Sequence, residues 1–267
     1  MTTSRFLVNL TVRSLSTLAL SLMVLLGTSV KANADEADAK RLLKAMSDYL
    51  ASQQAISFDY DAILEVVTKD KQILALASSG NITLNRPDKI LATRSSGFAD
   101  VEMSFDGKTL TLLGKNLNIY AQEEVPGTVD NLIDALLKRN RPLPAADLLS
   151  ADPYEGLMHD VTDIKDLGSG VIGGVECDYL AFRAREVDWQ IWIAQGERPY
   201  PCRYVISSTP IDGQPEYSIQ IRKWKTGDEV AATDFSFKNP FDAKKVDLKN
   251  LEGADELPEH FQIGDAK

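Results

Sequence analysis

The strongest constraint on the fold is a period-two alternation of apolar and polar residues that recurs along most of the chain. From residue 56 to residue 66 every even position is apolar, and Ser57, Asp59 and Asp61 stand between. Successive side chains of a strand point to opposite faces, so this pattern predicts an antiparallel strand with one buried face. Further strands are predicted at residues 73–85, 88–95, 99–105, 108–114, 117–123, 160–166, 175–184, 187–195, 202–209, 215–224 and 229–237.

Two segments instead show helical spacing. Residues 36–53 place apolar side chains on one helical face. These are Leu42, Leu43, Met46 and Leu50. Thr128 is a favourable N-cap for a second helix, in which apolar residues recur at i, i+3, i+4, i+7 and i+8. These are Val129, Leu132, Ile133, Leu136 and Leu137. Shorter helical pieces are predicted near residues 148–149 and 154–158.

The order is therefore a helix, about six strands, a helical insertion and about six more strands, with a turn predicted at residues 168–174. An open sheet of this size must curl to cover its apolar face. We predict an α+β fold: a curved antiparallel sheet of about 11–12 strands, forming an unclosed β-barrel. The N-terminal helix and the mid-chain helices cover it as a lid or plug. Residues 35–267 are expected to form a single domain.

The N-terminal segment has the features of a secretory signal. Arg5 and Arg13 precede an apolar run from Leu15 to Val30, and the small-x-small sequence Ala32-Asn33-Ala34 follows. This order predicts a cleavable signal peptide at residues 1–34 and a periplasmic location. The alternative is a membrane anchor, but the run is shorter than the roughly 20 residues that span a bilayer. No later stretch is long and apolar enough to be a membrane helix.

The charge of the chain excludes one class of partner. All 39 Asp and Glu follow residue 34, whereas three of the 29 Lys and Arg precede it, so removing the signal makes the net charge more negative than −10. Such an acidic protein repels phosphate backbones, and we expect no binding to nucleic acid.

Two cysteines, Cys177 and Cys202, lie in the exported part. Exported cysteines can oxidise, which makes the pair a candidate disulfide, and two small buried thiols are the alternative. If one strand lies between them, their Cα atoms are about 9.6 Å apart. Bonded Cα atoms are rarely beyond about 7 Å, so a bridge would need a bend in a strand.

No set of residues points to catalysis, and we expect no catalytic residue, no cofactor and no metal. The two histidines, His159 and His260, have no cluster of further ligands in the sequence. No G-x-S-x-G motif is present. Residues 168–173 match G-x-G-x-x-G, but a β run follows where a dinucleotide site needs a helix. A hydrolase with a dispersed site is the least favoured function.

Four stretches resemble a bacterial family of predicted periplasmic proteins of unknown function, itself similar to the LolA-like lipoprotein carrier and receptor fold. They are residues 174–180 (GVECDYL), 188–193 (DWQIWI), 201–206 (PCRYVI) and 235–241 (FSFKNPF), the last resembling the final strand of that fold. The resemblance covers nearly all of the exported chain. It implies an unclosed β-barrel around an apolar cavity, capped by helices, into which acyl chains enter.

We therefore expect a non-enzymatic binding or carrier protein for an apolar ligand, such as a lipid or a lipoprotein acyl chain. The expected lining of the cavity is Phe58, Tyr60, Leu132, Leu136, Leu137, Trp189 and Ile191. The same residues would otherwise form a packed core, and the sequence leaves both readings open. The alternative function is an envelope module that binds a protein through a sheet edge or through Trp192 and Trp224, which lie off the aliphatic face of their strands.

Overall fold

The computed structural model describes residues 36–139, 143, 145–239, 242–248 and 251. The chain divides into two units, residues 1–33 and 34–267, and every described residue belongs to the second. The expected signal segment and His260 lie outside the described residues. Among the described residues, no helix combines the length and the apolar character needed to cross a lipid bilayer.

The first half of the unit contains one long helix and six strands. They are α1 (Glu36–Ser52), β1 (Ala55–Val67), β2 (Ile73–Asn85), β3 (Lys89–Ser96), β4 (Asp100–Phe105), β5 (Thr109–Gly114) and β6 (Ile119–Glu124). Short helical elements follow: α2 (Val129–Lys138), η1 (Ala146–Leu148) and α3 (Pro153–Met158). The order of helix, strands and helical insertion is as the sequence predicts.

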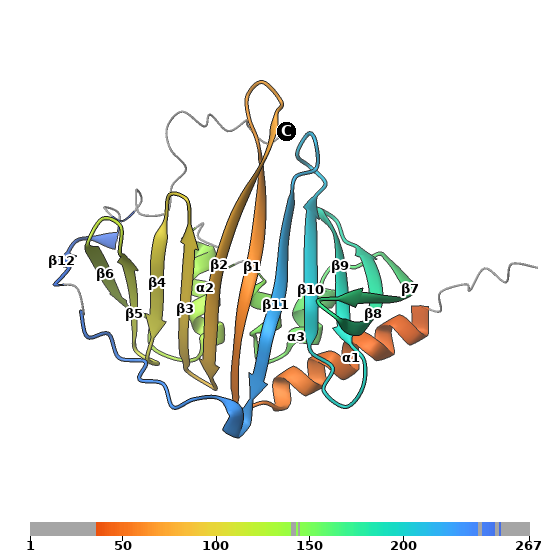
Figure 1. Cartoon of the computed structure of the whole chain (residues 1–267), viewed down its shortest axis with the longest axis horizontal. Coiled ribbons are helices and arrows are strands. Elements are labelled where there is room, and N and C mark those ends of the chain that lie inside the picture. The colour runs from red at the N-terminus through yellow and green to blue at the C-terminus, as the bar shows by residue number, and fades with distance from the viewer. Residues whose placement is uncertain (1–35, 140–142, 144, 240–241, 249–250, 252–267) are drawn as a thin grey trace, which may run out of the picture. The chain divides into compact units, whose positions relative to one another are not determined.

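Strands dominate the second half as well. They are β7 (Asp163–Ile172), β8 (Val175–Arg183), β9 (Val187–Ala194), β10 (Pro201–Ser208), β11 (Glu216–Thr226) and β12 (Lys244–Lys245), with the short helix η2 (Gly227–Glu229) after β11. All strands belong to one 12-stranded sheet in the order β12-β6-β5-β4-β3-β2-β1-β11-β10-β9-β8-β7 (Figure 1). The predicted α+β class with a curved, unclosed sheet is confirmed.

The ladder between β1 and β11 joins the two halves of the sheet. It runs antiparallel from the pair Ile56 and Thr226 to the pair Leu64 and Tyr217. On its other side β1 pairs with β2 along all 13 of its residues. Since β1 and β11 are far apart in the sequence, this ladder makes one surface from two sets of strands.

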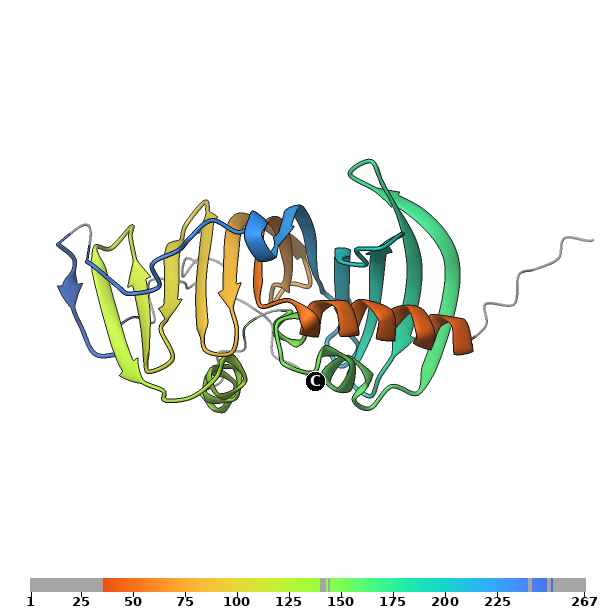
Figure 2. The same cartoon turned by 90° about the horizontal axis from the view of Figure 1, so that it is seen from below.

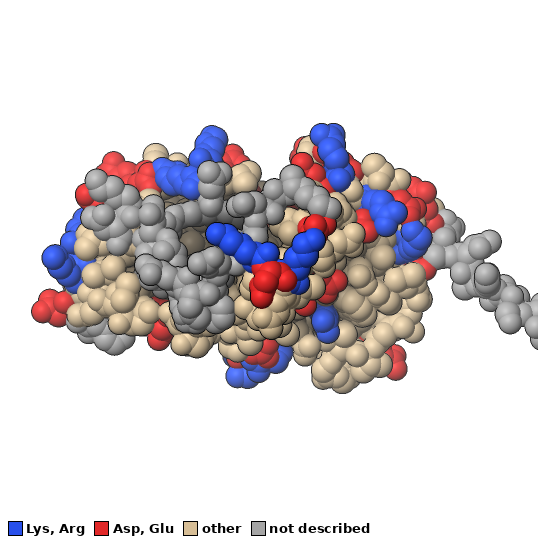
Figure 3. Space-filling model, turned by 90° about the horizontal axis from the view of Figure 1, so that it is seen from above, with Lys and Arg blue, Asp and Glu red and all other residues tan. Residues whose placement is uncertain are grey.

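The helices lie on one face of the sheet, which we call the inner face (Figure 2). Apolar side chains of α1, α2, η1 and α3 form one buried cluster with the inner-face side chains of β1–β5 and β7–β11. The outer face is largely polar. Seen from above, Lys and Arg side chains are interspersed with Asp and Glu side chains over the visible described surface (Figure 3).

The N-cap of α2 fixes where the helix begins, and the burial of its side chains shows which of its faces meets the sheet. The Thr128 side chain accepts from the Asn131 backbone N–H, and the Asn131 side chain accepts from the Thr128 backbone N–H, a reciprocal capping box. Leu132 and Leu136 are buried, but Leu137 is 61% exposed. Leu137 is about 100° around the helix from Leu136, which carries it past the edge of the buried face. The structure therefore places Leu137 apart from the buried residues predicted with it to line a ligand site.

One predicted turn and one predicted strand differ from the structure. The turn predicted at residues 168–174 is shorter, because β7 continues to Ile172 with a register shift between Asp166 and Ser169. Residues 229–237, with the expected final strand at Phe235, form no strand. Both edges of β11 are already paired, with β1 and β10, so residues 229–237 cannot pair as a hairpin with the strand that precedes them.

The segment after β11 instead leads back to the far edge of the sheet (Figures 1 and 2). The ring of Phe237 lies 4.8 Å from that of Tyr120 on β6. β12 then pairs with β6 in parallel, and Leu251 packs against Ala121. The C-terminal segment thereby covers the β6 edge, where unpaired backbone groups would otherwise invite pairing with another chain.

The contrast between buried and exposed positions of α2 gives a matched test of stability. We expect Leu132→Ala to lower the free energy of unfolding by about 2–5 kcal/mol, because it empties a fully buried site. Leu137→Ala should change it by no more than about 0.5 kcal/mol. Urea denaturation followed by circular dichroism measures both. Equal losses for the two variants would contradict the orientation of α2.

Candidate functional site

The inner face brings together six of the seven residues predicted to line a ligand site. Phe58, Tyr60, Leu132, Leu136, Trp189 and Ile191 are each no more than 7% exposed and share one apolar cluster. They come from β1, α2 and β9, so the cluster spans both halves of the sheet. This inner face, with its helical cover, is the candidate site.

Aromatic rings form the part of the site under α1 and α3. The Trp189 ring stacks on Phe182 with centroids 3.8 Å apart, and the edge of Tyr204 meets it at 5.7 Å. Phe182 on β8 pairs directly with Trp189 on β9, whereas Tyr204 on β10 pairs with Ile191 and is therefore a diagonal neighbour of Trp189. Large rings on neighbouring strands give this region a broad apolar surface.

A second aromatic row crosses the junction of the two halves. Phe58 on β1 stacks on Trp224 of β11 at 5.4 Å, and Trp224 stacks on Tyr200 at 5.3 Å. Strict alternation predicts Trp224 on the other face, and this prediction is wrong. Between the pairs Asp59–Arg222 and Ser57–Lys225, two residues of β11 oppose one of β1, and Lys223 has φ +52°. This bulge turns Trp224 to the inner face.

The end of α1 is held to this aromatic row by hydrogen bonds. The Tyr49 hydroxyl accepts from Trp224 Nε1 at 3.3 Å and from Arg198 Nε at 3.4 Å. Arg198 is in turn paired with Glu229 at 2.8 Å. Burial alone would raise the pKa of the Tyr49 phenol, but hydrogen bonds with Thr226, Arg198 and Trp224 lower it overall. Sequence patterns could not reveal this contact, because Tyr49 and Trp224 are 175 residues apart.

Polar groups are also built into the inner face. The Tyr60 hydroxyl donates to the Thr93 carbonyl at 2.9 Å, and burial raises the pKa of Tyr60. Gly80 makes room for this contact, because a Cβ there would lie 1.9 Å from the Thr93 oxygen. Burial also raises the pKa of Tyr217. The apolar surface thus contains tyrosine hydroxyls that remain neutral.

Asp147 in η1 is a polar residue that sequence reasoning missed. Solvent reaches it, yet the surrounding protein raises the pKa of its carboxyl group. Its charge also raises the pKa of Tyr204, whose larger shift comes from burial. Asp147 therefore adds a carboxyl group near the Trp189–Tyr204 pair.

A groove of about 540 Å³ lies on the other side of α1, between this helix and α3. Its lining is Ala37, Lys40, Arg41, Lys44, Ala45, Asp48 and Tyr154. The Lys44 ammonium group lies 5.6 Å from the centre of the Tyr154 ring. This groove is open and charged, unlike the apolar surface beneath α1.

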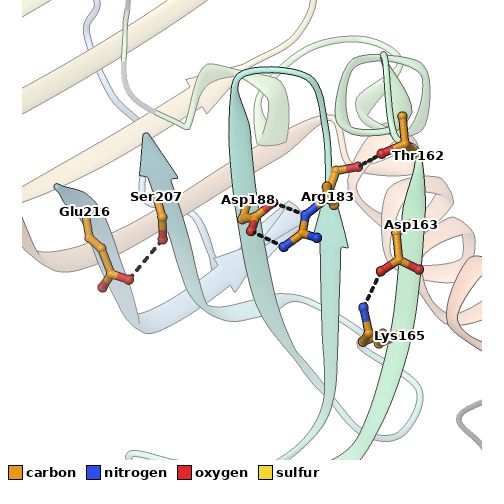
Figure 4. A network of polar contacts seen from close by, with 7 residues as sticks. All are labelled: Thr162, Asp163, Lys165, Arg183, Asp188, Ser207 and Glu216. Carbon is orange, nitrogen blue, oxygen red and sulfur yellow. Dashed lines mark hydrogen bonds and ion pairs between the residues drawn. The ribbon is translucent and has the colours of Figure 1, made fainter. Parts of the chain in front are cut away.

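The outer face is stabilised by polar pairs between neighbouring strands (Figure 4). Arg183 on β8 donates to both carboxylate oxygens of Asp188 on β9, each at 2.9 Å. Ser207 donates to Glu216 at 2.9 Å between β10 and β11. The hydrogen bond from Arg183 lowers the pKa of Asp188. Because this face is polar and solvated, it separates solvent from the apolar side of the same strands.

The remaining predicted residues lie away from the inner face. His159 follows α3 with its side chain 82% exposed, 3.7 Å from Asp160. Within the described part of the chain, no group of three or more His, Cys, Asp or Glu is placed to hold a metal ion. Cys177 and Cys202 are both buried, and no disulfide joins them in this structure.

Comparison with known proteins places the chain among envelope proteins. Residues 39–249 match the model of a family described as "Predicted periplasmic protein (DUF2092)". This match confirms the resemblance to a periplasmic family and the expected location. No curated protein matches the sequence.

The solved structures that match this chain include the following three. The lipoprotein LppX of Mycobacterium tuberculosis is 11% identical, with a TM-score of 0.45 over 75% of this chain and 100% of its own. LprF of Mycobacterium bovis is 11% identical, with a TM-score of 0.45 over 79% and 99%. A LolA superfamily protein of Nitrosomonas europaea is 10% identical, with a TM-score of 0.36 over 74% and 97%.

The Arg183–Asp188 pair predicts a dependence of stability on pH. Since the folded pKa of Asp188 lies below its ordinary value, the pair stabilises the fold above about pH 4 and is lost as pH falls through the folded pKa. Between about pH 5 and pH 3, we expect the melting temperature of Asp188→Asn to fall less than that of the wild type. This range spans the ordinary pKa of Asp, roughly 4.

The partner residue supplies the control for this test. Arg183→Gln breaks the same hydrogen bonds. At neutral pH the double variant Arg183→Gln/Asp188→Asn should therefore be no less stable than the less stable of the two single variants. Fully additive losses in thermal melts would show that the two side chains do not act as a pair.

Proposed function

The chain belongs to the DUF2092 family of predicted periplasmic proteins, and on this premise we propose that it is a non-enzymatic carrier of an apolar ligand. The ligand is a lipid or a lipoprotein acyl chain. It is held between the curved sheet and the helices on the inner face. Residues 1–34 are removed as a signal peptide, and residues 35–267 act as one domain.

The continuity of the inner face is the observation that carries this proposal. The β1–β11 ladder makes one apolar surface from the strands of both halves, and in the described part of the chain separate helices rather than a second sheet cover it. A second sheet would close such a surface permanently. A cover made of separate helices can move aside and expose apolar side chains to a ligand.

The helices differ in how firmly they are attached. The backbone of α1 closely approaches α3, β7 and β9, and Tyr49 is hydrogen-bonded to Trp224. Among the described elements, the body of α2 has fewer close backbone approaches to the strands than α1 and rests on the sheet through Leu132 and Leu136. Its two ends are held by the hydrogen bond from the Val129 N–H to the Pro87 carbonyl at 2.9 Å and by the ion pair of Arg139 with Glu123 on β6. We therefore assign the movable part of the cover to α2.

An acyl chain can replace the side chains that leave when α2 moves. Each methylene group taken out of water contributes about 0.8 kcal/mol, so a long chain offsets the loss of a few leucine contacts. Tyr60, Tyr204 and Asp147 supply hydrogen-bonding groups beside this surface for the polar end of the ligand. An apolar interior with few polar groups is the usual design of a small-molecule site.

A second function is supported by an aromatic group on the outer face. The Tyr179 ring stacks on Trp192 at 4.3 Å, and the Arg203 guanidinium group lies 5.6 Å from the centre of the Trp192 ring. Tyr, Trp and Arg are the residues that most often dominate protein interfaces. The alternative is therefore an envelope module that binds a protein on this face without a small ligand.

A pair of neighbouring leucines in α2 tests the carrier function. The protein isolated from its own periplasm should carry lipid, detected by native mass spectrometry and lipid extraction. Leu136→Trp should reduce the bound lipid several-fold, because it fills the space between helix and sheet. Leu137→Trp should leave it unchanged, because that side chain is exposed.

Circular dichroism must show that both tryptophan variants fold. If the wild type carries no lipid and does not bind a fluorescent fatty acid, the carrier function is rejected. Loss of a co-purified protein partner on Trp192→Ala, with no lipid present, would support the alternative.

A further inference from the structure

Cys177 and Cys202 lie together in a small apolar cluster of their own, separate from the main core. They are 0% and 2% exposed, and Ala194, at 3%, lies between them in the cluster. Partly buried residues close this cluster: Ile172, Val175, Trp192 and Tyr200. The three central residues belong to β8, β9 and β10, which are neighbours in the sheet.

In three regular strands the outer two are about 9.6 Å apart, too far for a disulfide. This sheet is irregular at Cys202. Pro201 pairs with Ile193 and Arg203 with Trp192, so Cys202 is an extra residue in β10. Such a bulge bends its strand and redirects a side chain. Cys177 pairs with Ala194, so the side chain between the two thiols is a single methyl group.

The two thiols are consequently in contact. They belong to one buried cluster, and the proximity of each to the other contributes to the pKa shifts of both groups. The bend that a bridge would need is therefore present at Cys202, and the bulge has placed the sulfur atoms together.

We propose that Cys177 and Cys202 form an intramolecular disulfide in the periplasm, linking β8 to β10 across β9. The periplasm is an oxidising compartment, so an adjacent pair of thiols meets the conditions for bond formation there. The bridge is independent of whether the inner face binds a ligand.

The oxidant is a disulfide-bonded donor of the thiol–disulfide oxidoreductase class. The thiolate of one cysteine attacks a donor sulfur, which forms a mixed disulfide and releases one donor thiolate. The thiolate of the other cysteine then attacks the protein sulfur of that mixed disulfide and releases the second donor thiolate. The two protons of the cysteines end on the two donor thiols, and the donor gains both electrons.

Burial determines when this reaction takes place. It is the largest cause of the raised pKa of both thiols, so few thiolates exist in the folded protein. The bond therefore forms before the outer residues close over the cluster. A protein folded in the reduced state should react slowly with the same donor.

The bridge would also hold a residue that contacts the candidate site. The Tyr200 hydroxyl is a hydrogen-bonding partner of Cys202, and its ring stacks on Trp224. Trp224 donates to Tyr49 at the end of α1. The bond thereby fixes the strand bulge next to the attachment point of α1.

Intact-mass measurement on the full chain exported to a bacterial periplasm tests the proposal. The protein is unfolded in guanidinium with iodoacetamide, with and without prior reduction. We expect no alkylation without reductant, alkylation of both cysteines after it, and a monomer on a non-reducing gel. Alkylation of both cysteines without reductant, or a disulfide-linked dimer, would overturn the proposal.

The double variant Cys177→Ala/Cys202→Ala provides a second measurement. A bridge of this loop length should make the wild type melt about 5–15 °C higher than the variant under non-reducing conditions. The difference should shrink when the wild type is unfolded and refolded in reductant. An equal difference in both conditions would assign the effect to packing of the thiols and contradict the bridge.

Discussion

The pairing of β1 with β11 is the interaction on which the rest of the structure depends. It pairs two segments that are about 160 residues apart in the sequence, as the hydrogen bond from Arg222 to Asp61 illustrates. On the outer side the ladder carries the ion pairs Asp61–Arg222 and Asp59–Lys223, each at 2.7 Å. On the inner side it carries the stack of Phe58 on Trp224. One ladder thus supports both the polar outer face and the continuous apolar inner face.

The fold follows closely from the sequence where a local pattern dictates structure. The alternation from Ile56 to Val66 predicts β1, and the helical spacing after Thr128 predicts α2, because each pattern records a face that packs on the core. The errors arise where tertiary context decides. Residues 229–237 have the composition of a strand, but both edges of the preceding strand β11 are already paired, so they cannot join the sheet beside it. The bulge at Lys223 reverses the side of Trp224, and alternation carries no signal of it.

The site could be predicted only in part. Its large apolar residues, such as Trp189 and Leu132, follow from periodicity because burial selects them. Its polar groups do not. Tyr49 is hydrogen-bonded to Trp224, and the charge of Asp147 contributes to the raised pKa of Tyr204. Both interactions join segments that are distant in the sequence. No local pattern records such pairs. Polar contacts hold both helices: Tyr49 joins α1 to Trp224, and the Arg139–Glu123 ion pair joins the end of α2 to β6.

The most direct test of the account is photo-crosslinking with a fatty acid that carries a photoreactive group on its acyl chain. Peptide mapping by mass spectrometry then locates the label. The account predicts labelling of α2 and of inner-face residues of β1 and β9, such as Phe58 and Trp189. It also predicts that unlabelled lipid suppresses this labelling. Labelling confined to outer-face residues such as Tyr179 and Trp192, or labelling that unlabelled lipid leaves unchanged, would contradict it.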